Sequence, residues 1–341
     1  MKIAFLNFYQ ANRGLETFVN ELSTHLSKDN EVLLLDGQQK EASTRDPITL
    51  LQRLFLDRDS LKVCTWTFKQ LKSLKNFKPD LVIPTNGGWQ ALIISIFGRL
   101  IGSKIVIAGQ SGPGWDDRWN LLCKPHSFVA LTQRQAKWAK KATPWPRQNI
   151  AKIPNGVDMT KFKSAGKKVE LQLEKPITLV VAATVPYKRV EQGIAAVSRL
   201  KQGSFLLLGK GPQDKRTDNL GYKLLGKGRY QRLTVPFTQM PDYYRSVDLF
   251  SLCSASTEAF GIVYLEAMAS GLACVATDDE SRREIVGDAG IYVKNPDDVV
   301  EYSKALEKAL NKNWGSIPLN QAKKFSWKKS AESYHKLFKS L

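Results

Sequence analysis

Two carboxylates and a glycine share one segment, residues 256–277, which reads S-T-E-A-F-G-I-V-Y-L-E-A-M-A-S-G-L-A-C-V-A-T. Its apolar pattern predicts a helix that begins near Gly261 and ends at Ser270–Gly271. Gly261 has no Cβ, so a ligand can approach the backbone closely there. The first amides of a helix lack intrahelical partners and suit an anion such as a diphosphate. The amides concerned belong to Phe260, Gly261, Ile262 and Val263.

The two carboxylates are Glu258, just before the predicted helix, and Glu266, within it. Eight positions separate them, which corresponds to about two helical turns. One carboxylate could then face a sugar while the other reaches a ribose. An ordinary βα unit with two surface glutamates has the same pattern, so these residues alone leave both interpretations open.

The elements around this segment alternate between strands and helices. Phe18, Leu22 and Leu26, for example, recur at helical spacing. Such alternation predicts an α/β fold with parallel sheets that are covered on both faces. The predicted strands are 3–8, 31–36, 81–84, 104–108, 127–131 and 150–153, followed by 177–184, 204–209, 232–235, 248–253, 273–277 and 290–293.

A chain of 341 residues exceeds the usual size of one domain, so we expect two. The first Rossmann-like domain is predicted at 1–162 and the second at 177–322. A linker at 163–176 contains Gly166, the adjacent lysines 167–168 and Pro176. Residues 323–341 are expected to form an amphipathic helix that packs back on the first domain. The carboxyl ends of both sheets are expected to face a cleft, where open α/β sheets bind ligands.

The composition narrows the class of protein. The net charge of +19 favours an anionic partner. The four scattered cysteines and three isolated histidines make a metal site unexpected. The paired aspartates at 116–117, 278–279 and 297–298 are better explained as helix caps and turns. The start M-K-I-A-F-L-N-F-Y-Q favours a strand over a signal peptide, and the apolar stretch 91–98 is too short to span a bilayer. We therefore expect a cytoplasmic chain.

The segment with the two glutamates, followed by R-R-E-I-V-G-D-A-G-I-Y-V and N-P-D-D, resembles the E-x7-E donor site of glycosyltransferase family 4. Four further segments agree in order: R-G-L-E-T-F-V-N-E-L (13–22), I-P-N-G-V-D (153–158), A-T-V-P-Y-K-R-V (183–190) and L-L-L-G-K-G-P (206–212). The resemblance implies a retaining, metal-independent hexosyltransferase of the GT-B fold. Its donor substrate would be a nucleotide-diphosphate sugar, on the side of the second domain, with no cofactor. Its acceptor, on the side of the first domain, would be a glycan or a lipid-linked acceptor, as in the synthesis of a cell-surface polysaccharide or glycolipid.

The resemblance also implies roles for individual residues. Lys188 would neutralise the leaving diphosphate, assisted by its neighbour Arg189. Glu258 would hold or face the transferred sugar, and Glu266 would accept hydrogen bonds from the ribose hydroxyls. Gly14 would touch the diphosphate, Gly209 would lie near the nucleotide base, and Gln110 would lie close to the sugar.

Three positions depart from the family pattern. Ala183 stands where the family usually has an arginine, Arg13 replaces a loop glycine, and Gln110 replaces a histidine. Glutamine can hydrogen-bond a hydroxyl but cannot shuttle a proton at neutral pH. Two alternatives follow: a nucleotide-sugar epimerase of the same fold, and a degenerate protein that binds a nucleotide sugar without turnover.

Two basic-aromatic runs, 58–78 and 134–148, have the composition of helices at an anionic membrane surface. In the first run Lys62, Lys69, Lys72 and Lys75 alternate with apolar residues that include Leu61 and Trp66. We therefore hypothesise peripheral contact with the inner membrane face. An ordinary amphipathic helix that buries its aromatic residues would look the same. No nucleic-acid-binding module is recognisable, so no nucleic acid partner is expected.

Overall fold

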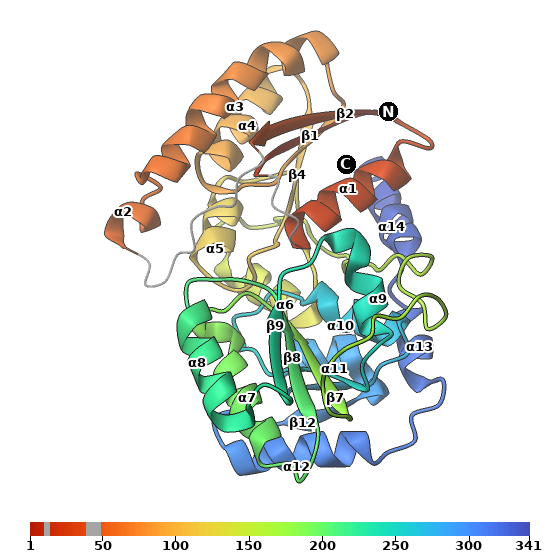
Figure 1. The fold of residues 1–341 in the computed structure, drawn as a ribbon. Helices are drawn as coiled ribbons and strands as arrows, with labels where there is room; N and C mark the ends of the chain where they lie inside the picture. Colours follow the sequence, from red (N-terminus) through yellow and green to blue (C-terminus); the bar gives the residue numbers. More distant parts are fainter. Residues whose placement is uncertain (10–13, 39–48) are drawn as a thin grey trace. The chain divides into compact units, whose positions relative to one another are not determined.

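The computed structural model describes residues 1–9, 14–38 and 49–341 (Figure 1). Arg13, which departs from the family pattern, lies outside the described residues. The chain divides into two compact units, one of Met1–Gly156 with Trp327–Leu341 and one of Val157–Ser326. No helix of the described residues is long and apolar enough to cross a membrane.

The first unit is built on a parallel six-stranded sheet in the order β2-β1-β3-β4-β5-β6. Because the chain moves outward in both directions from β1 and β3, the strand order reverses between these two strands. The strands are β1 (Lys2–Tyr9), β2 (Glu31–Gln38), β3 (Leu81–Pro84), β4 (Lys104–Ala108), β5 (Ser127–Ala130) and β6 (Ile150–Lys152). The helices are α1 (Gly14–Leu26), α2 (Leu50–Arg53), α3 (Arg58–Phe77), α4 (Gly88–Leu100), α5 (Trp115–Leu122), α6 (Gln133–Ala142) and α14 (Trp327–Lys339).

The last helix, α14, belongs to this first unit. It packs beside α1 (Figure 1), with the ring of Phe18 6.4 Å from that of Trp327 and 6.1 Å from that of Tyr334. Both helices bury an apolar stripe that the i, i+4 spacing of the sequence marks. The chain thus returns to its first unit only after the second is complete.

The second unit has a parallel sheet in the order β12-β11-β10-β7-β8-β9. The chain runs outward from β7 in one direction and from β10 in the other, so the switch point lies between β7 and β10. The strands are β7 (Ile177–Val181), β8 (Ser204–Leu208), β9 (Tyr230–Leu233), β10 (Leu249–Leu252), β11 (Cys274–Thr277) and β12 (Gly290–Val293). The α-helices are α7 (Val190–Ser198), α8 (Asp214–Leu225), α9 (Met240–Tyr244), α10 (Ile262–Ala269), α11 (Glu280–Val286), α12 (Val299–Leu310) and α13 (Ile317–Ala322), and short 3-10 helices lie at Pro186–Lys188, Phe237–Gln239 and Gly287–Ala289.

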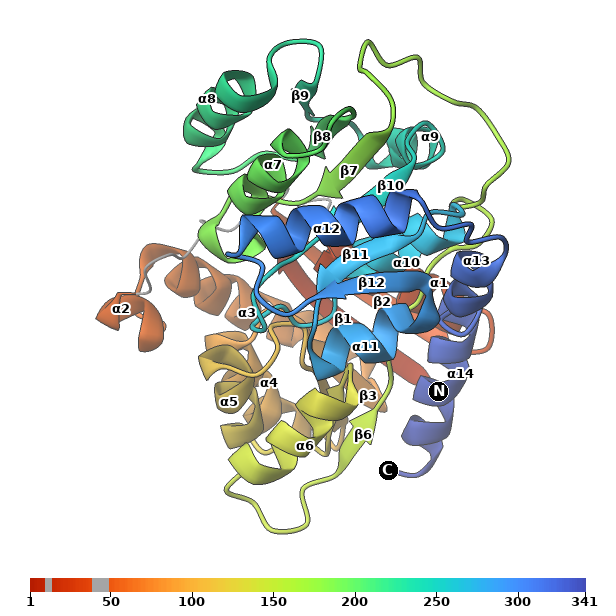
Figure 2. The same ribbon diagram turned by 90° about the horizontal axis from the view of Figure 1, so that it is seen from below.

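Helices form a layer on each face of this second sheet. α7 contacts α8 and α12 (Figure 2), while α10 contacts α11 and α13. Right-handed crossovers on the two sides of the switch point place α7 and α8 on one face and α10 and α11 on the other. After the last strand, α12 packs on the side of α7 and α13 on the side of α10. The inner strands are accordingly buried on both faces, as their continuous apolar runs predict. The predicted α/β class with two doubly wound parallel sheets is confirmed.

The boundary between the units falls earlier than the sequence placed it. Phe162 lies in the second unit, where its ring packs 5.9 Å from Phe237 and 5.8 Å from Tyr244. The stretch 163–176 is also part of this unit, because Arg245 donates from Nε to the carbonyl of Lys167 (2.7 Å). Strand β9 begins two residues earlier than predicted.

Candidate functional site

The switch point of the second sheet brings two predicted site residues together. Lys188 closes the short 3-10 helix that follows β7, and Glu258 lies in the loop that follows β10. The backbone amide of Ala255 donates to the carbonyl of Tyr187 (2.7 Å), which ties the two loops to each other. Neighbouring strands β7 and β10 therefore deliver residues 70 positions apart to one place.

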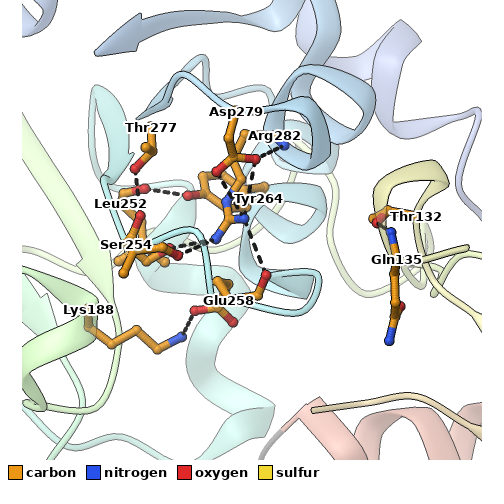
Figure 3. A network of polar contacts seen from close by, with 11 residues as sticks. Thr132, Gln135, Lys188, Leu252, Ser254, Glu258, Tyr264, Thr277, Asp279 and Arg282 are labelled. Atoms are coloured by element: carbon orange, nitrogen blue, oxygen red, sulfur yellow. Dashed lines mark hydrogen bonds and ion pairs between the residues drawn. The ribbon is translucent and has the colours of Figure 1, made fainter. Parts of the chain in front are cut away.

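Lys188 and Glu258 point toward each other and form an ion pair (Figure 3), in which Nζ donates to Oε2. Their side chains are only 14% and 13% exposed. Burial by itself would raise the pKa of Glu258, but the nearby charges of Lys188 and Arg282 hold that pKa below its usual value. Glu258 is therefore a buried, ionised carboxylate with a cation in direct contact.

Arg282, a residue that the sequence reasoning did not single out, lies beneath the same loop. Its side chain is fully buried and donates to the carbonyls of Ala255 (3.1 Å) and Glu258 (3.3 Å) and to the hydroxyl of Ser254 (3.0 Å). Figure 3 shows the guanidinium enclosed by these groups and by Asp279, 3.2 Å away. Arg282 thus fixes the loop that carries Glu258.

Two more hydrogen bonds hold this loop to its strand and helix. The hydroxyl of Thr277 donates to the carbonyl of Ser254 (2.6 Å), and the hydroxyl of Tyr264 donates to the carbonyl of Leu252 (Figure 3). Strand β11 and helix α10 therefore both restrain the exit of β10. Buried polar groups satisfied in this way rigidify the site.

Helix α10 begins as predicted, with Gly261 as its N-cap at φ 82° and ψ 68°. A Cβ at Gly261 would lie 2.8 Å from the ring of Tyr264 and 4.0 Å from Cγ of Glu258. Only glycine adopts this left-handed conformation without strain. The N-terminal amides of residues 260–263, predicted to bind an anion, are therefore close to Glu258.

Glu266 lies inside α10 and is 4% exposed. Its Oε2 accepts a hydrogen bond from the hydroxyl of Tyr244 (2.8 Å), a residue that no sequence motif marks as its partner. Burial raises the pKa of Glu266 to about 7, and the hydrogen bond from Tyr244 offsets part of that rise. Glu266 can therefore change its protonation state near neutral pH.

The glycines after β8 mark a close approach of two backbones. Gly209 has φ 149°, and a Cβ there would lie 2.0 Å from the carbonyl oxygen of Ala182. A Cβ at Gly211 would lie 2.6 Å from Oγ1 of Thr184, whose hydroxyl donates to Asp214 (2.6 Å). The turns after β7 and β8 are thus locked together at the carboxyl edge of the sheet.

Arg189 has a different orientation from its neighbour Lys188. It adopts φ 51° and ψ 40° at the start of α7, and its Nη2 lies 3.4 Å from Oδ2 of Asp297. That aspartate also accepts a hydrogen bond from Gln192 (3.0 Å). The guanidinium of Arg189 is therefore paired with a carboxylate other than Glu258.

The predicted site residues of the first unit also lie at the carboxyl edge of their sheet. Gly14 opens α1, and Gln110 follows β4. The amides of Gln110 and Asn155 exchange two hydrogen bonds, of 3.0 and 3.3 Å. Gln135, drawn with Thr132 in Figure 3, donates to the carbonyl of Gly109 (2.6 Å) and so supports the turn that carries Gln110.

The paired aspartates mostly act at helix starts, as predicted. Asp279 caps α11 and Asp298 caps α12 through their side chains. Asp117 differs, because it is fully buried and accepts hydrogen bonds from Gln135 (2.7 Å) and Asn120 (3.3 Å). Burial raises the pKa of Asp117 to about 7.

Comparison with known families points to one class of protein. Residues 162–329 match the family model described as glycosyl transferases group 1. This segment covers almost the whole second unit, with the Lys188–Glu258 pair, Arg282 and α10. The match supports a glycosyltransferase.

Among curated proteins, the phosphatidyl-myo-inositol mannosyltransferase of Mycolicibacterium smegmatis is 29% identical over 175 residues, which are 48% of this chain and 43% of that protein. The chain thus spans less than half of this relative's length. Among solved structures, HepE of Anabaena in complex with UDP-glucose has a TM-score of 0.78 at 17% identity, covering 100% of both chains. Sucrose-phosphate synthase of Thermosynechococcus elongatus has a TM-score of 0.79 at 16% identity, covering 100% of this chain and 98% of that one. These structures confirm the predicted GT-B fold.

Proposed function

We propose that this chain is a retaining glycosyltransferase that moves a hexose-type sugar from a nucleotide-diphosphate sugar to a glycan or lipid-linked acceptor. The observation that carries the proposal is the buried Lys188–Glu258 pair at the switch point of the second sheet, beside Gly261 at the start of α10. Open α/β sheets bind their ligands at this point. A cation, a carboxylate and free helix amides converge there.

The proposed reaction breaks the bond between the anomeric carbon and the leaving phosphate oxygen. The acceptor oxygen forms its bond on the same face of the sugar, and the acceptor's proton passes to the leaving phosphate. Negative charge develops on the diphosphate as the bond breaks, and preorganised donors at that position lower the barrier. Lys188 and the amides of residues 260–263 are the donors we assign to this role.

Lys188 can contact the diphosphate while it keeps its ion pair with Glu258. An ammonium group has three N–H donors, so it can contact a carboxylate and a phosphate oxygen at once. Arg282 remains as a fixed second charge near Glu258. Glu258 would then face the transferred sugar as an ionised carboxylate, and Glu266 would accept hydrogen bonds from the ribose.

The comparisons favour this choice of substrates. One structural neighbour holds UDP-glucose, and one relative is named a phosphatidyl-myo-inositol mannosyltransferase. We extend both to this chain as a nucleotide-sugar donor and a glycan or lipid-linked acceptor. We place the reaction at the cytoplasmic face of a membrane, where a lipid-linked acceptor is accessible.

The proposal is tested in two steps. A thermal-shift panel of UDP-, GDP- and ADP-sugars should single out a donor, because a ligand that binds only the folded state raises the melting temperature. The slow reaction of that donor with water is then followed by proton NMR. A first product with the donor's anomeric configuration supports a retaining transferase, and the opposite anomer would contradict it. Conversion into an isomeric nucleotide sugar would support the epimerase instead. Binding of the donor without turnover, either with water or with any acceptor in a screen, would support the degenerate protein.

A further inference from the structure

Four leucines on and after α2 lie exposed to water. Leu50, Leu51, Leu54 and Leu56 are 71%, 58%, 47% and 45% exposed. Single exposed leucines are common on protein surfaces, but a contiguous group of them marks a contact site. We call these four leucines the leucine surface. Helix α3 begins two residues after Leu56 and carries two further exposed apolar side chains, Leu61 and Phe68, which are 46% and 57% exposed.

The segment that carries the four leucines is attached to the first unit by a buried ring and two hydrogen bonds. Phe55, between the exposed leucines, is buried with its ring 5.1 Å from that of Trp119. The indole of Trp89 donates to the carbonyl of Phe55 (2.8 Å), and the indole of Trp115 donates to the carbonyl of Arg53 (2.6 Å). The leucines are therefore displayed by a segment that is fastened to the first unit.

Helix α3 adds charge to the leucine surface. Leu61 and Phe68 are seven residues apart, about two turns, so they share one face of the helix. Lys72 and Lys75 continue that face at i+4 and i+7 from Phe68 and are exposed. Trp66, the aromatic residue that the sequence suggested for a membrane contact, instead packs against Phe8 with ring centroids 5.4 Å apart.

The charge around the leucine surface is predominantly positive. Arg53, Arg58, Lys62 and Lys69 are exposed beside the lysines already named. The acidic residues of the same stretch are Asp57, the N-cap of α3, and Asp59, which pairs with Lys62 (3.2 Å). Apolar side chains surrounded by cations complement an anionic lipid bilayer, in which negatively charged headgroups lie above the hydrocarbon chains.

We propose that the leucine surface inserts into the headgroup region of an anionic lipid bilayer. An anionic bilayer matches both the apolar side chains and the surrounding cations. The carbonyl of Phe55 accepts from Trp89 in the first turn of α4, and that of Arg53, the last residue of α2, accepts from Trp115 at the start of α5. These two helices follow the carboxyl ends of β3 and β4. The bilayer would therefore lie next to the sheet edge where Gln110 is found, which brings a lipid-linked acceptor within reach of the first unit.

The test is flotation of the full chain with two kinds of vesicle, pure phosphatidylcholine and phosphatidylcholine mixed with phosphatidylglycerol. We expect binding to the mixed vesicles only, weakened by added salt. The variant Leu50→Ser/Leu51→Ser/Leu54→Ser should lower the partition constant by about tenfold or more per inserted leucine. Lys69→Gln/Lys72→Gln/Lys75→Gln should lower it by about fivefold per lysine.

Matched controls come from the second unit. Leu224→Ser removes a leucine that is 40% exposed on α8, and Lys201→Gln/Lys304→Gln/Lys308→Gln removes three exposed lysines. Both should bind the mixed vesicles like the unaltered chain. Unchanged melting temperatures and unchanged nucleotide binding should show that the leucine variant is folded.

Three outcomes would overturn the proposal. The first is equal flotation with both kinds of vesicle, and the second is a leucine variant that binds the mixed vesicles like the unaltered chain. The third is a dimer of the unaltered chain in light scattering, with the leucine variant monomeric. The last would identify a second copy as the occupant. None of these experiments measures sugar transfer, so their failure would leave the proposed function untouched, and the donor experiments above test that function independently.

Discussion

Glu258 is accompanied by two cations that differ in freedom of movement. Lys188 is a flexible side chain in direct contact with the carboxylate, whereas Arg282 is locked by hydrogen bonds to the loop backbone. A buried carboxylate that loses its partner is costly, because water no longer solvates it. The mobile cation is therefore suited to meeting a ligand, while the fixed one keeps the carboxylate ionised and in place.

Replacing Lys188 by Met should lower the turnover number by about 10²- to 10³-fold, the loss typical of removing one donor to a developing anion. It should also destabilise the fold by about 3 kcal/mol, because Glu258 loses its contact ion. Steady-state kinetics and chemical denaturation measure the two effects. Lys188→Met/Glu258→Gln should recover stability but not turnover, and Lys201→Met is the surface control. Full turnover in Lys188→Met would contradict the role.

Arg282→Met should displace the Glu258 loop and raise the pKa of Glu258, because one of the cations that lower it is gone. The acid limb of the turnover–pH profile should therefore move to higher pH. Arg282→Lys keeps the positive charge but loses the planar set of guanidinium donors that hold the loop. It should therefore return the acid limb of the pH profile to its original position, while the turnover number stays low. Its neighbour Arg283, paired with Asp278 on the surface, gives the control Arg283→Met. Profiles that coincide for all variants would contradict this role.

Glu266 should make nucleotide binding depend on pH. Its pKa is raised from its ordinary 4.5 to about 7 by burial. Linkage then lowers the free energy of unfolding as pH rises from 4.5 to about 7. A ribose that donates to the carboxylate favours the ionised form, so nucleotide affinity should rise as pH increases through 7. Titration calorimetry with UDP or GDP measures this.

Tyr244→Phe provides the companion experiment for Glu266. It removes the hydroxyl that holds the pKa of Glu266 down, so the midpoint of the affinity change should move to higher pH. Tyr243→Phe, one residue earlier, is the matched control. An affinity independent of pH around neutrality would show that Glu266 does not meet the nucleotide.

At the scale of elements, the turns after β7 and β8 depend on a glycine. Gly209→Ala would place a Cβ 2.0 Å from the carbonyl oxygen of Ala182, so the two turns must separate. The variant should lose more than about 1 kcal/mol of stability and bind nucleotide more weakly. Gly228→Ala, whose Cβ would meet only Glu174 at 3.6 Å, should do neither. Chemical denaturation measures the stability of both variants, and titration calorimetry measures their nucleotide affinity. Equal values for the two variants would contradict the prediction.

Much of the element pattern could be predicted because it depends on local sequence. The buried strands are continuous apolar runs, and α10 is bounded by glycines at both ends, so its limits were correct. β9 was placed too late because its residues are polar: Arg232 pairs there with Asp214 and Asp218. These ion pairs join residues of two different elements, so they produce no periodic pattern of apolar residues in the sequence.

The supporting residues of the site could not be predicted in the same way. Arg282 and Arg283 are adjacent and chemically identical, yet one is fully buried and the other exposed. The available signal was helical phase, since Arg282 lies three residues before the buried Ile285 in a helix capped by Asp279. The partnership of Tyr244 with Glu266 joins α9 to α10, and no spacing within the sequence announces it.

At the scale of the whole molecule, the second unit interrupts the first. The chain leaves its first unit at Gly156 and returns at Trp327. The first core is therefore completed only when the last helix, α14, is present to cover α1. The nucleotide-binding groups we propose, Lys188, Glu258 and Glu266, all lie in the uninterrupted second unit. The two units should accordingly respond differently to damage at the chain's end.

Trp327→Ala tests this arrangement. Trp327 is 2% exposed and packs against Phe18, and removing a buried tryptophan costs about 3–5 kcal/mol. Scanning calorimetry should show a lower melting temperature for the first unit, while the transition of the second unit and its affinity for nucleotide persist. Lys328→Ala, at the exposed neighbouring position, should leave both transitions unchanged. If Trp327→Ala abolished nucleotide binding and melted the chain in one step, the second unit could not fold without the first, and the nucleotide site would depend on both.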